Sequence, residues 1–399
     1  MSDRSVPLAI TAYTVTCAAG RGREAFARAL AERKSGLREN DLAQWPLNCW
    51  IGRVAGIEDA PLPPAWVSWE SRNHRLAWMA LHTDGFRECA LAAIERYGAA
   101  RVALILGTST SSIGETERAY RELGTDGRFD ATQRRSRVHN SHALAAFVQR
   151  ALGVRAPCLT ISTACSSSAK VFASAQRLLR AGLADAAIVG GVDTLCGSVL
   201  CGFNALELVS TEPCRPFDVA RSGLSLGEAA GFALLESITV DKSAARLVGY
   251  GESADAHHMS APHPHGLGAE RAFDEALARA GLAPADVDYI NLHGTASRQN
   301  DAVEAALIAR RFPATTLASS TKGWTGHTLG AAGIVEAVAA LLAIERGFAP
   351  GTLNARELDP VCGPQIRIDN APRRVRVALS NSFGFGGNNC CLIFAAGAA

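Results

Sequence analysis

The chain has 399 residues, of which 48% are hydrophobic and 20% charged, and its formal net charge is +2. This composition indicates a globular protein, and the length predicts two domains or two fused halves. The near-neutral charge gives no general case for nucleic acid or an anionic membrane as a partner. The first residues lack the features of a signal peptide, and no run of about 18 apolar residues occurs, so we expect a cytoplasmic protein.

The first part of the chain alternates strand and helix patterns. Apolar runs predict strands at 8–12, 102–106, 158–161, 186–190 and 231–236, and helical periodicity predicts helices at 23–34, 72–97, 115–123 and 170–181. A further helix ends near Leu152, and Asn140 and Ser141 are suitable caps for its start. Residues 38–66 and the proline-containing segment after residue 190 are read as loops with short elements.

The second part repeats this order of elements. Strands are predicted at 247–251, 289–292, 316–319, 376–379 and 391–394, and helices at 270–280, 301–311 and 330–345. In each part, a strand followed by a polar loop and a helix occurs twice. The sequence therefore predicts an α/β fold of two similar halves, residues 1–240 and 241–399, whose loops meet at one site.

Cys165 lies between the predicted strand 158–161 and the following helix, within a run of small residues. The N-terminus of a helix favours an anion, so this position is expected to lower the pKa of the thiol and to make it reactive. Most of the eleven cysteines are expected to be small buried residues. Because the chain has no C-x-x-C pair, they are predicted to be free thiols.

Two histidines and a lysine occupy loops of the second half. His293 directly follows a strand, His327 stands at a helix start, and Lys322 precedes it by five residues. A single histidine is more often structural than catalytic. Two histidines, a lysine and a reactive cysteine, all on loops between strands and helices, are typical of an active site.

Four motifs in this order resemble those of the β-ketoacyl synthases of the thiolase superfamily, closest to the acyl-carrier-protein synthases of the I/II type. The motifs are residues 163–168 around Cys165, His293-Gly294-Thr295 with Asp301, residues 322–333 with Lys322 and His327, and the tail 381–388. The resemblance covers the whole chain and implies the five-layered αβαβα thiolase fold.

The resemblance also implies a mechanism. Cys165 would take an acyl group from a carrier's phosphopantetheine thioester, and His293 and His327 would stabilise the enolate formed from malonyl-carrier protein, giving a chain two carbons longer. The backbone N–H groups of Cys165 and Phe383 would form the oxyanion hole, with the Phe383 side chain gating the acyl pocket. The remaining implied residues are Lys322 with Glu336 and Asp301 as a supporting network, and Thr295, Ser297 and Phe385 for substrate binding.

The implied partners are an acyl carrier protein and a second subunit. Arg72 and Arg75 are candidates for the carrier's basic landing site, with 134–137 as a second candidate. The subunit partner is either a second copy or a related chain-length-factor subunit. The histidine-rich stretch 257–265 fits no common zinc spacing, so neither a metal nor a cofactor is expected.

Two alternatives on the same fold remain open. A catalytically silent chain-length subunit would lack the nucleophile, which this chain has. A thioester hydrolase or plain acyltransferase could use the same cysteine but would not need two histidines. Within the family, the residues 107–111, 161–175 and 255–259 look most like synthases of aryl-polyene pigments, which would make polyunsaturated chains.

Overall fold

The structure, a computed structural model, describes residues 5–237 and 242–397. The expected boundary between residues 240 and 241 therefore lies outside the described residues. The first group of main strands comprises β1 (Leu8–Cys17), β5 (Val102–Gly107), β6 (Cys158–Ile161), β7 (Ala186–Asp193) and β9 (Ala229–Glu236). The second group comprises β10 (Arg246–Ala254), β11 (Tyr289–Asn291), β12 (Leu317–Ser319), β15 (Val377–Gly384) and β16 (Asn388–Ala395).

The two groups have the same topology. The spatial order is β6-β5-β7-β9-β1 in the first and β12-β11-β15-β16-β10 in the second, so that each reads third, second, fourth, fifth and first strand in chain order. In both groups the second strand is parallel to the third and the fourth, and the fifth is antiparallel to its neighbours. The groups join where β1 pairs with β10 at Leu8–Leu247 and Ala9–Arg246.

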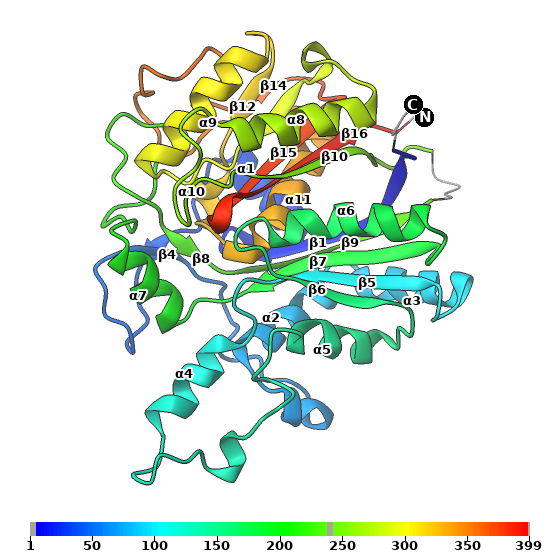
Figure 1. The fold of residues 1–399 in the computed structure, drawn as a ribbon, viewed down its shortest axis with the longest axis vertical. Helices are drawn as coiled ribbons and strands as arrows, with labels where there is room; N and C mark the ends of the chain where they lie inside the picture. The colour runs from blue at the N-terminus through cyan, green and yellow to red at the C-terminus, as the bar shows by residue number, and fades with distance from the viewer. Residues whose placement is uncertain (1–4, 238–241, 398–399) are drawn as a thin grey trace.

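Helices form three layers around these strands (Figure 1). The central helices α6 (Ser167–Arg180) and α11 (Ala332–Arg346) lie between the two groups of strands and contact both. The first group is covered on its outer face by α2 (Arg72–Leu81), α3 (Phe86–Tyr97) and α5 (Ala143–Leu152), and the second by α8 (Leu267–Ala280) and α9 (Arg298–Arg311). The predicted αβαβα arrangement is confirmed.

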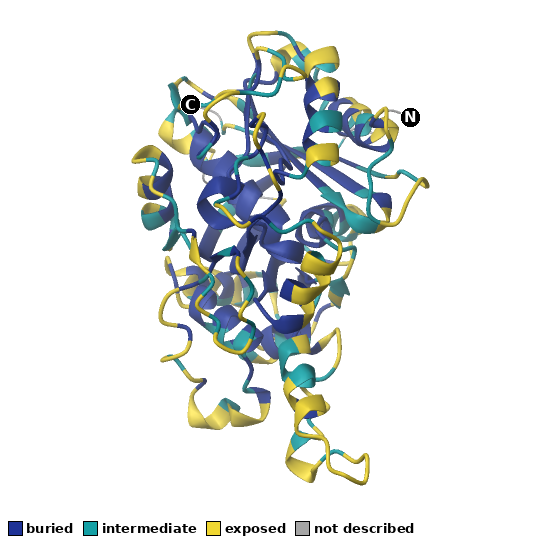
Figure 2. Cartoon of the chain, turned by 90° about the vertical axis from the view of Figure 1, so that its left-hand side faces the viewer, coloured by how far each residue is buried: buried dark blue, intermediate teal, exposed yellow. Residues whose placement is uncertain are grey.

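The central helix α11 is buried along most of its length. Figure 2 shows the buried residues, in dark blue, gathered at the centre of the molecule. Every residue from Ala332 to Ala343 is buried, and most are alanine, valine, isoleucine or leucine. A helix that is apolar on all sides is stable only when other elements surround it. Glu336 is the one charged residue in this buried stretch. Because a buried charge is costly without a partner, it requires a polar or charged group beside it.

Three local predictions were wrong. The periodicity over 72–97 is split into α2 and α3 by a turn in which Asp84 and Gly85 have φ values of 57° and 70°. Helix α5 begins after His142, without the predicted side-chain cap. Helix α11 starts at Ala332, after a 3₁₀ turn over 329–331, rather than at residue 330.

A further helix, α7 (Gly197–Ala205), was not predicted. Two glycines and a serine give it low intrinsic helix propensity. Its start is stabilised from elsewhere in the chain, because the Glu117 carboxylate of α4 (Ile113–Arg121) accepts hydrogen bonds from the N–H groups of Gly197 and Ser198, at 3.0 and 2.6 Å. A cap supplied by another helix leaves no signal in the local sequence.

Short elements complete the described chain. They are α1 (Arg23–Ala31), α10 (Lys322–Thr325), β2 (Gly20–Arg21), β3 (Arg38–Glu39), β4 (Trp50–Gly52), β8 (Leu226–Gly227), β13 (Phe348–Ala349), β14 (Ala371–Pro372) and five 3₁₀ turns at 64–69, 131–133, 284–286, 329–331 and 385–387. The eleven cysteines are free thiols, as predicted. Among the described residues, each helix is too short or too polar to cross a membrane.

Candidate active site

The turn that carries Cys165 is built from small and hydroxyl side chains. Ala164 has a φ of 52°, a left-handed conformation that costs a non-glycine residue about 1–2 kcal/mol. The Ser167 hydroxyl accepts from Thr163 N at 2.9 Å and donates to Ala164 O at 2.6 Å, and Ser166 Oγ donates to Thr163 O at 2.9 Å. These bonds satisfy the turn's backbone groups, which explains why small hydroxyl residues surround the cysteine.

The Cys165 thiol is buried, with the residue 5% exposed. Helix α6 begins at Ser167, so the cysteine precedes its first residue by two positions. Burial raises the pKa of Cys165 to about 12 and outweighs the lowering by Lys322 and by the Phe385 backbone N–H. The expectation of a lowered pKa was therefore wrong, since both halves enclose the sulfur and the desolvation cost exceeds the benefit of the helix start.

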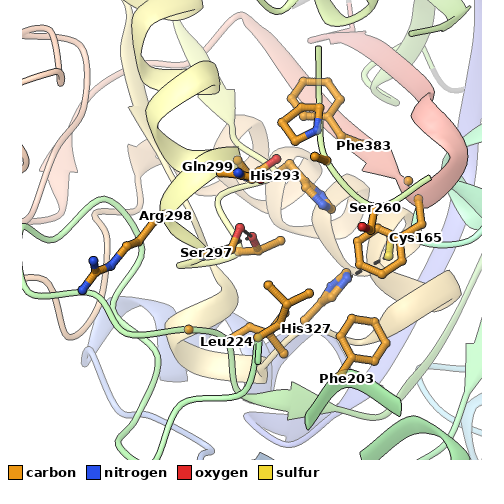
Figure 3. Close-up of a pocket in the computed structure, with 18 of the residues that line it drawn as sticks. Cys165, Phe203, Leu224, Ser260, His293, Ser297, Arg298, Gln299, His327 and Phe383 are labelled. Carbon is orange, nitrogen blue, oxygen red and sulfur yellow. Dashed lines mark hydrogen bonds between the residues drawn. The ribbon is translucent and has the colours of Figure 1, made fainter. Parts of the chain in front are cut away.

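His327 is the nearest polar side chain to that sulfur. Its Nε2 lies 2.9 Å from Cys165 Sγ (dashed in Figure 3), and its backbone is fixed on both sides by Ser225 O and by the N–H of Gly227, at 2.7 and 2.9 Å. His327 Nδ1 has no hydrogen-bond partner in the described part of the chain. A proton on Nδ1 would be left unpaired, so we assign it to Nε2, where it faces the sulfur.

His293 lies beside His327, with ring centroids 5.4 Å apart and planes at 88°. The Lys322 ammonium contacts His293 through Nδ1, at 3.5 Å, and through the backbone carbonyl, and it forms an ion pair with Glu336. Burial and the charge of Lys322 hold the pKa of each histidine well below its usual value. Both imidazoles are therefore neutral and act as N–H donors rather than as cations.

Two buried carboxylates of α9 fix the His293 loop. Glu304 accepts from the N–H groups of His293 and Gly294 at 2.9 and 2.8 Å, and Asp301 accepts from Phe217 N at 2.7 Å and from Ala296 N at 3.2 Å. Burial raises their pKa values, to about 7 for Glu304 and about 6 for Asp301, against the lowering by these N–H groups. Asp301 was expected as a supporting residue, whereas Glu304 was missed.

These groups open into one cavity of about 490 Å³. Figure 3 shows Cys165, His293 and His327 gathered toward one side of it, with Arg298 on the opposite side. The expected substrate-binding residues Thr295, Ser297 and Phe385 also line the cavity, as does Phe383, which was expected at the oxyanion hole and as the gate of the acyl pocket. The hydroxyls of Thr295 and Ser297 are 3.0 Å apart, and the Phe385 ring stacks on Phe203 of α7 at 5.5 Å.

The tail motif 381–388 contacts the nucleophile loop directly. Gly384 packs so closely that a Cβ there would lie 2.6 Å from Thr163 O. Because the Phe385 backbone N–H faces the Cys165 sulfur, this loop supplies a donor to the reacting atom. Glycine at 384 is required by this approach of two backbones.

The arginines expected to receive a carrier protein have partners within the chain. Arg72 forms two hydrogen bonds to Glu228, at 2.8 and 2.6 Å, and contacts Glu58, while Arg75 pairs with Glu70. Neither of them lines the cavity that holds Cys165. Of the second candidate patch, Arg135 contacts Glu115 and a backbone carbonyl. These pairs leave little of the Arg72 and Arg75 charge for a partner.

The described residues contain no group of three or more histidine, cysteine or acidic side chains arranged to hold a metal ion. The histidines at 257, 258, 263 and 265 lie on an exposed or half-buried loop. The ring centroids of His257 and His263 are 5.2 Å apart, and those of His263 and His265 are 5.8 Å apart. The Nδ1 atoms of His258 and His263 accept hydrogen bonds from backbone N–H groups. Those bonds shape the loop that borders the cavity.

The geometry suits acyl chemistry. A buried thiol beside two neutral N–H donors can hold an acyl group as a thioester and can stabilise negative charge on a second carbonyl oxygen bound next to it.

Comparison with known proteins agrees with this geometry. Residues 73–240 match the β-ketoacyl synthase N-terminal domain, and residues 244–356 match the C-terminal domain. Nodulation protein E of Rhizobium meliloti (strain 1021) is 38% identical over 330 residues, covering 80% of this chain and 81% of that protein. The mitochondrial 3-oxoacyl-[acyl-carrier-protein] synthase of Arabidopsis thaliana is 41% identical over 263 residues, covering 61% and 57%.

Solved structures give the same result over almost the whole chain. The ketosynthase ApeO of Xenorhabdus doucetiae, solved in complex with its chain length factor ApeC, gives a TM-score of 0.88 at 37% identity, covering 98% of each chain. The ishigamide ketosynthase/chain length factor gives a TM-score of 0.88 at 27% identity, covering 99% of this chain and 100% of that one. The chain therefore belongs to the β-ketoacyl synthase family of condensing enzymes, which are acyltransferases.

Proposed function

We propose that this enzyme joins an acyl group held on Cys165 to malonyl-carrier protein by decarboxylative Claisen condensation. The observation that carries the proposal is the placement of Cys165 Sγ 2.9 Å from His327 Nε2, with His293 beside it, in one cavity. The roles of the individual residues follow from that placement.

In the first step, the Cys165 sulfur attacks the thioester carbonyl of an acyl-carrier protein. The new S–C bond forms as the bond to the pantetheine sulfur breaks, and the proton of the cysteine leaves with the carrier's thiol. The N–H of His327 stabilises the thiolate as it forms. The donors for the carbonyl oxygen are the Cys165 backbone N–H and the 383–385 loop, whose Phe385 N–H faces the sulfur.

In the second step, malonyl-carrier protein loses carbon dioxide. Its thioester oxygen becomes an enolate, which accepts hydrogen bonds from His293 and His327. The carbanion attacks the acyl-Cys165 carbonyl, so that a C–C bond forms as the C–S bond to Cys165 breaks, and the released thiolate takes up a proton from solvent. Neutral donors suit this step because a charged imidazolium would give its proton to the enolate. Burial, with the charge of Lys322 as a smaller cause, keeps both histidines neutral, and Lys322, paired with Glu336, also holds the His293 backbone.

The carrier's arm enters past Thr295 and Ser297, whose hydroxyls face each other at 3.0 Å and can bond its amide groups. The Phe383 side chain, 5.6 Å from the His293 ring, is placed to gate the acyl pocket. The reaction uses the two carrier-bound substrates and needs no further group.

The alternative activities would require fewer of the residues gathered in this site. A hydrolase or simple acyltransferase would use Cys165 but not the paired donors His293 and His327. We assign residues 1–240 and 241–399 as the two halves, the first carrying the cysteine and the second both histidines.

Resemblance to aryl-polyene synthases supports a polyunsaturated product.

We also propose assembly with a related subunit through β6, the strand at the free edge of the first group of strands. Its outer edge has no strand partner among the described residues, and Leu159 is 39% exposed on it. An open edge is a template for another strand. The ApeO–ApeC and ishigamide complexes favour a chain length factor as that subunit.

Sedimentation tests the assembly. Leu159→Lys should convert the dimer to monomer, while Leu183→Lys, a leucine 54% exposed just after α6, should leave the mass unchanged. A dimer that survives Leu159→Lys would place the interface elsewhere. A wild-type chain that is monomeric alone and dimeric with a chain length factor would identify the heterodimer.

Mass spectrometry of the reconstituted reaction tests the activity. The wild type, incubated with acyl- and malonyl-carrier proteins, should carry the acyl group on Cys165 and release a product longer by two carbons. Cys165→Ala should remain folded, acquire no acyl group and yield no product. An acyl group on another cysteine, or free acid as the product, would contradict the proposal.

A further inference from the structure

Arg298 stands apart from the other charged residues of the cavity. It is exposed, it lies at the side opposite Cys165 in Figure 3, and it is the only lysine or arginine among the described residues that line the cavity. The described residues give its guanidinium no ion-pair or hydrogen-bond partner. A free cation therefore stands where a substrate enters.

The backbone that carries Arg298 is fixed. Its carbonyl accepts a hydrogen bond from Arg221 Nη2 at 3.1 Å, and Arg221 is itself held by Asp359 at 2.7 Å. Ala296 N is tied to Asp301 at 3.2 Å. The Arg298 guanidinium is therefore carried by a fixed backbone and has no partner among the described residues, in contrast to Arg72 and Arg75, which are paired within the chain.

The remaining charges at the cavity do not compete for this cation. Asp255 is occupied, because it accepts hydrogen bonds from His263 N at 3.0 Å and from Asn389 Nδ2 at 2.8 Å. Glu207 is exposed and lies on the turn that follows α7. Arg298 also opens α9, where the Ser297 side chain makes no capping bond, so the first-turn N–H groups add positive potential at the same place.

We propose that Arg298 binds the phosphate of the 4′-phosphopantetheine arm. This inference rests on the proposed function and extends it to the recognition of the arm. The thioester end of the arm must reach Cys165, its amides pass Thr295 and Ser297, and its phosphate emerges at the opening, where Arg298 begins α9. A guanidinium binds phosphate oxygens through two parallel N–H bonds, which an amide or hydroxyl cannot do.

Small thioesters separate the phosphate from the carrier protein. The rate of Cys165 acylation is measured by mass spectrometry with acyl-4′-phosphopantetheine and with acyl-pantetheine, which lacks the phosphate. The wild type should show a KM about tenfold lower for the phosphorylated thioester, the size expected for one charge-assisted contact. Arg298→Ala should abolish this preference, leave the rate with acyl-pantetheine unchanged and leave kcat unchanged; Arg298→Lys should keep part of the preference.

Gln299→Ala, at the neighbouring exposed position, is the matched control and should behave as the wild type. If Arg298→Ala keeps the wild-type preference for the phosphorylated thioester, the assignment is overturned. An effect of Arg298→Ala seen with acyl-carrier protein but not with free acyl-4′-phosphopantetheine would also overturn it, because the contact would then be to the carrier's own carboxylates. Failure of the wild type to acquire an acyl group on Cys165 from any thioester would instead reject the proposed function.

Discussion

Asp193 Oδ2 accepts a hydrogen bond from Gly330 N at 2.7 Å, three residues beyond His327. The same fully buried carboxylate accepts five more bonds from the N–H and hydroxyl groups of residues 108–110. It thus joins the end of β5, in the first half, to the loop of His327, in the second. A Cβ on Gly330 would lie 2.6 Å from Asp193 Oδ2, so the approach requires glycine.

We expect Asp193→Asn to loosen the His327 loop. The amide offers one acceptor and places N–H groups among donors, which should cost about 3 kcal/mol of unfolding free energy. Asp193 also raises the pKa of Cys165, though burial is the larger cause, so the variant should react faster with iodoacetamide while its condensation rate falls more than tenfold. Urea unfolding, alkylation and turnover measure these effects; Asp185→Asn, in an exposed ion pair with Arg101, is the control.

The pH dependence of alkylation tests the state of the nucleophile. With the pKa of Cys165 raised by burial to about 12, the thiolate fraction should increase about tenfold per pH unit from pH 7 to pH 9.5 without a plateau. The rate is followed on the Cys165 peptide by mass spectrometry, with Cys165→Ala as the blank. A plateau near neutral pH would show instead a thiolate paired with an imidazolium.

Alanine substitutions of the two histidines should impair different steps of the reaction. His327 Nε2 lies against the sulfur, so His327→Ala should slow both acylation of Cys165 and malonyl decarboxylation. His293 faces Lys322 and makes no hydrogen bond to the sulfur in the described part of the chain, so His293→Ala should keep acylation near the wild-type rate and lose decarboxylation by about 10²-fold or more. Acyl adducts and released carbon dioxide are the two readouts. Equal loss of acylation in both variants would contradict this division.

Local sequence patterns predicted the strands, the loops that carry Cys165, His293 and His327, and the duplicated order, because strand and helix periodicities are local. The contact between Cys165 and His327 cannot be predicted from such local patterns. It depends on α6 and α11 packing between the two groups of strands, which brings residues 162 positions apart together. The duplicated order of elements and the family motifs, rather than any local pattern, indicated that these loops meet.

The residues missed by sequence analysis are buried acids with distant partners. Asp193 continues the apolar strand β7, and a charge at the end of a buried strand was a signal that could have been used. Glu304 looked like an ordinary residue of an amphipathic helix. Its function became apparent only from the structure, in which its carboxylate accepts hydrogen bonds from the backbone N–H groups of His293 and Gly294. The pKa of Cys165 was predicted in the wrong direction because desolvation depends on tertiary enclosure.

The stability of the protein should fall as pH rises through neutrality, in part because of Glu304. Burial raises the pKa of Glu304 from 4.5 to about 7 in the folded state, so between these values the folded chain holds a proton that the unfolded chain has released. This contribution is complete below about pH 4.5 and is lost as pH passes 7. Glu304→Gln lacks the titrating group and should reduce the dependence. Urea midpoints at pH 5, 6, 7 and 8 measure it, with exposed Glu95→Gln as the control; equal slopes in Glu304→Gln and the wild type would show that Glu304 is ionised throughout.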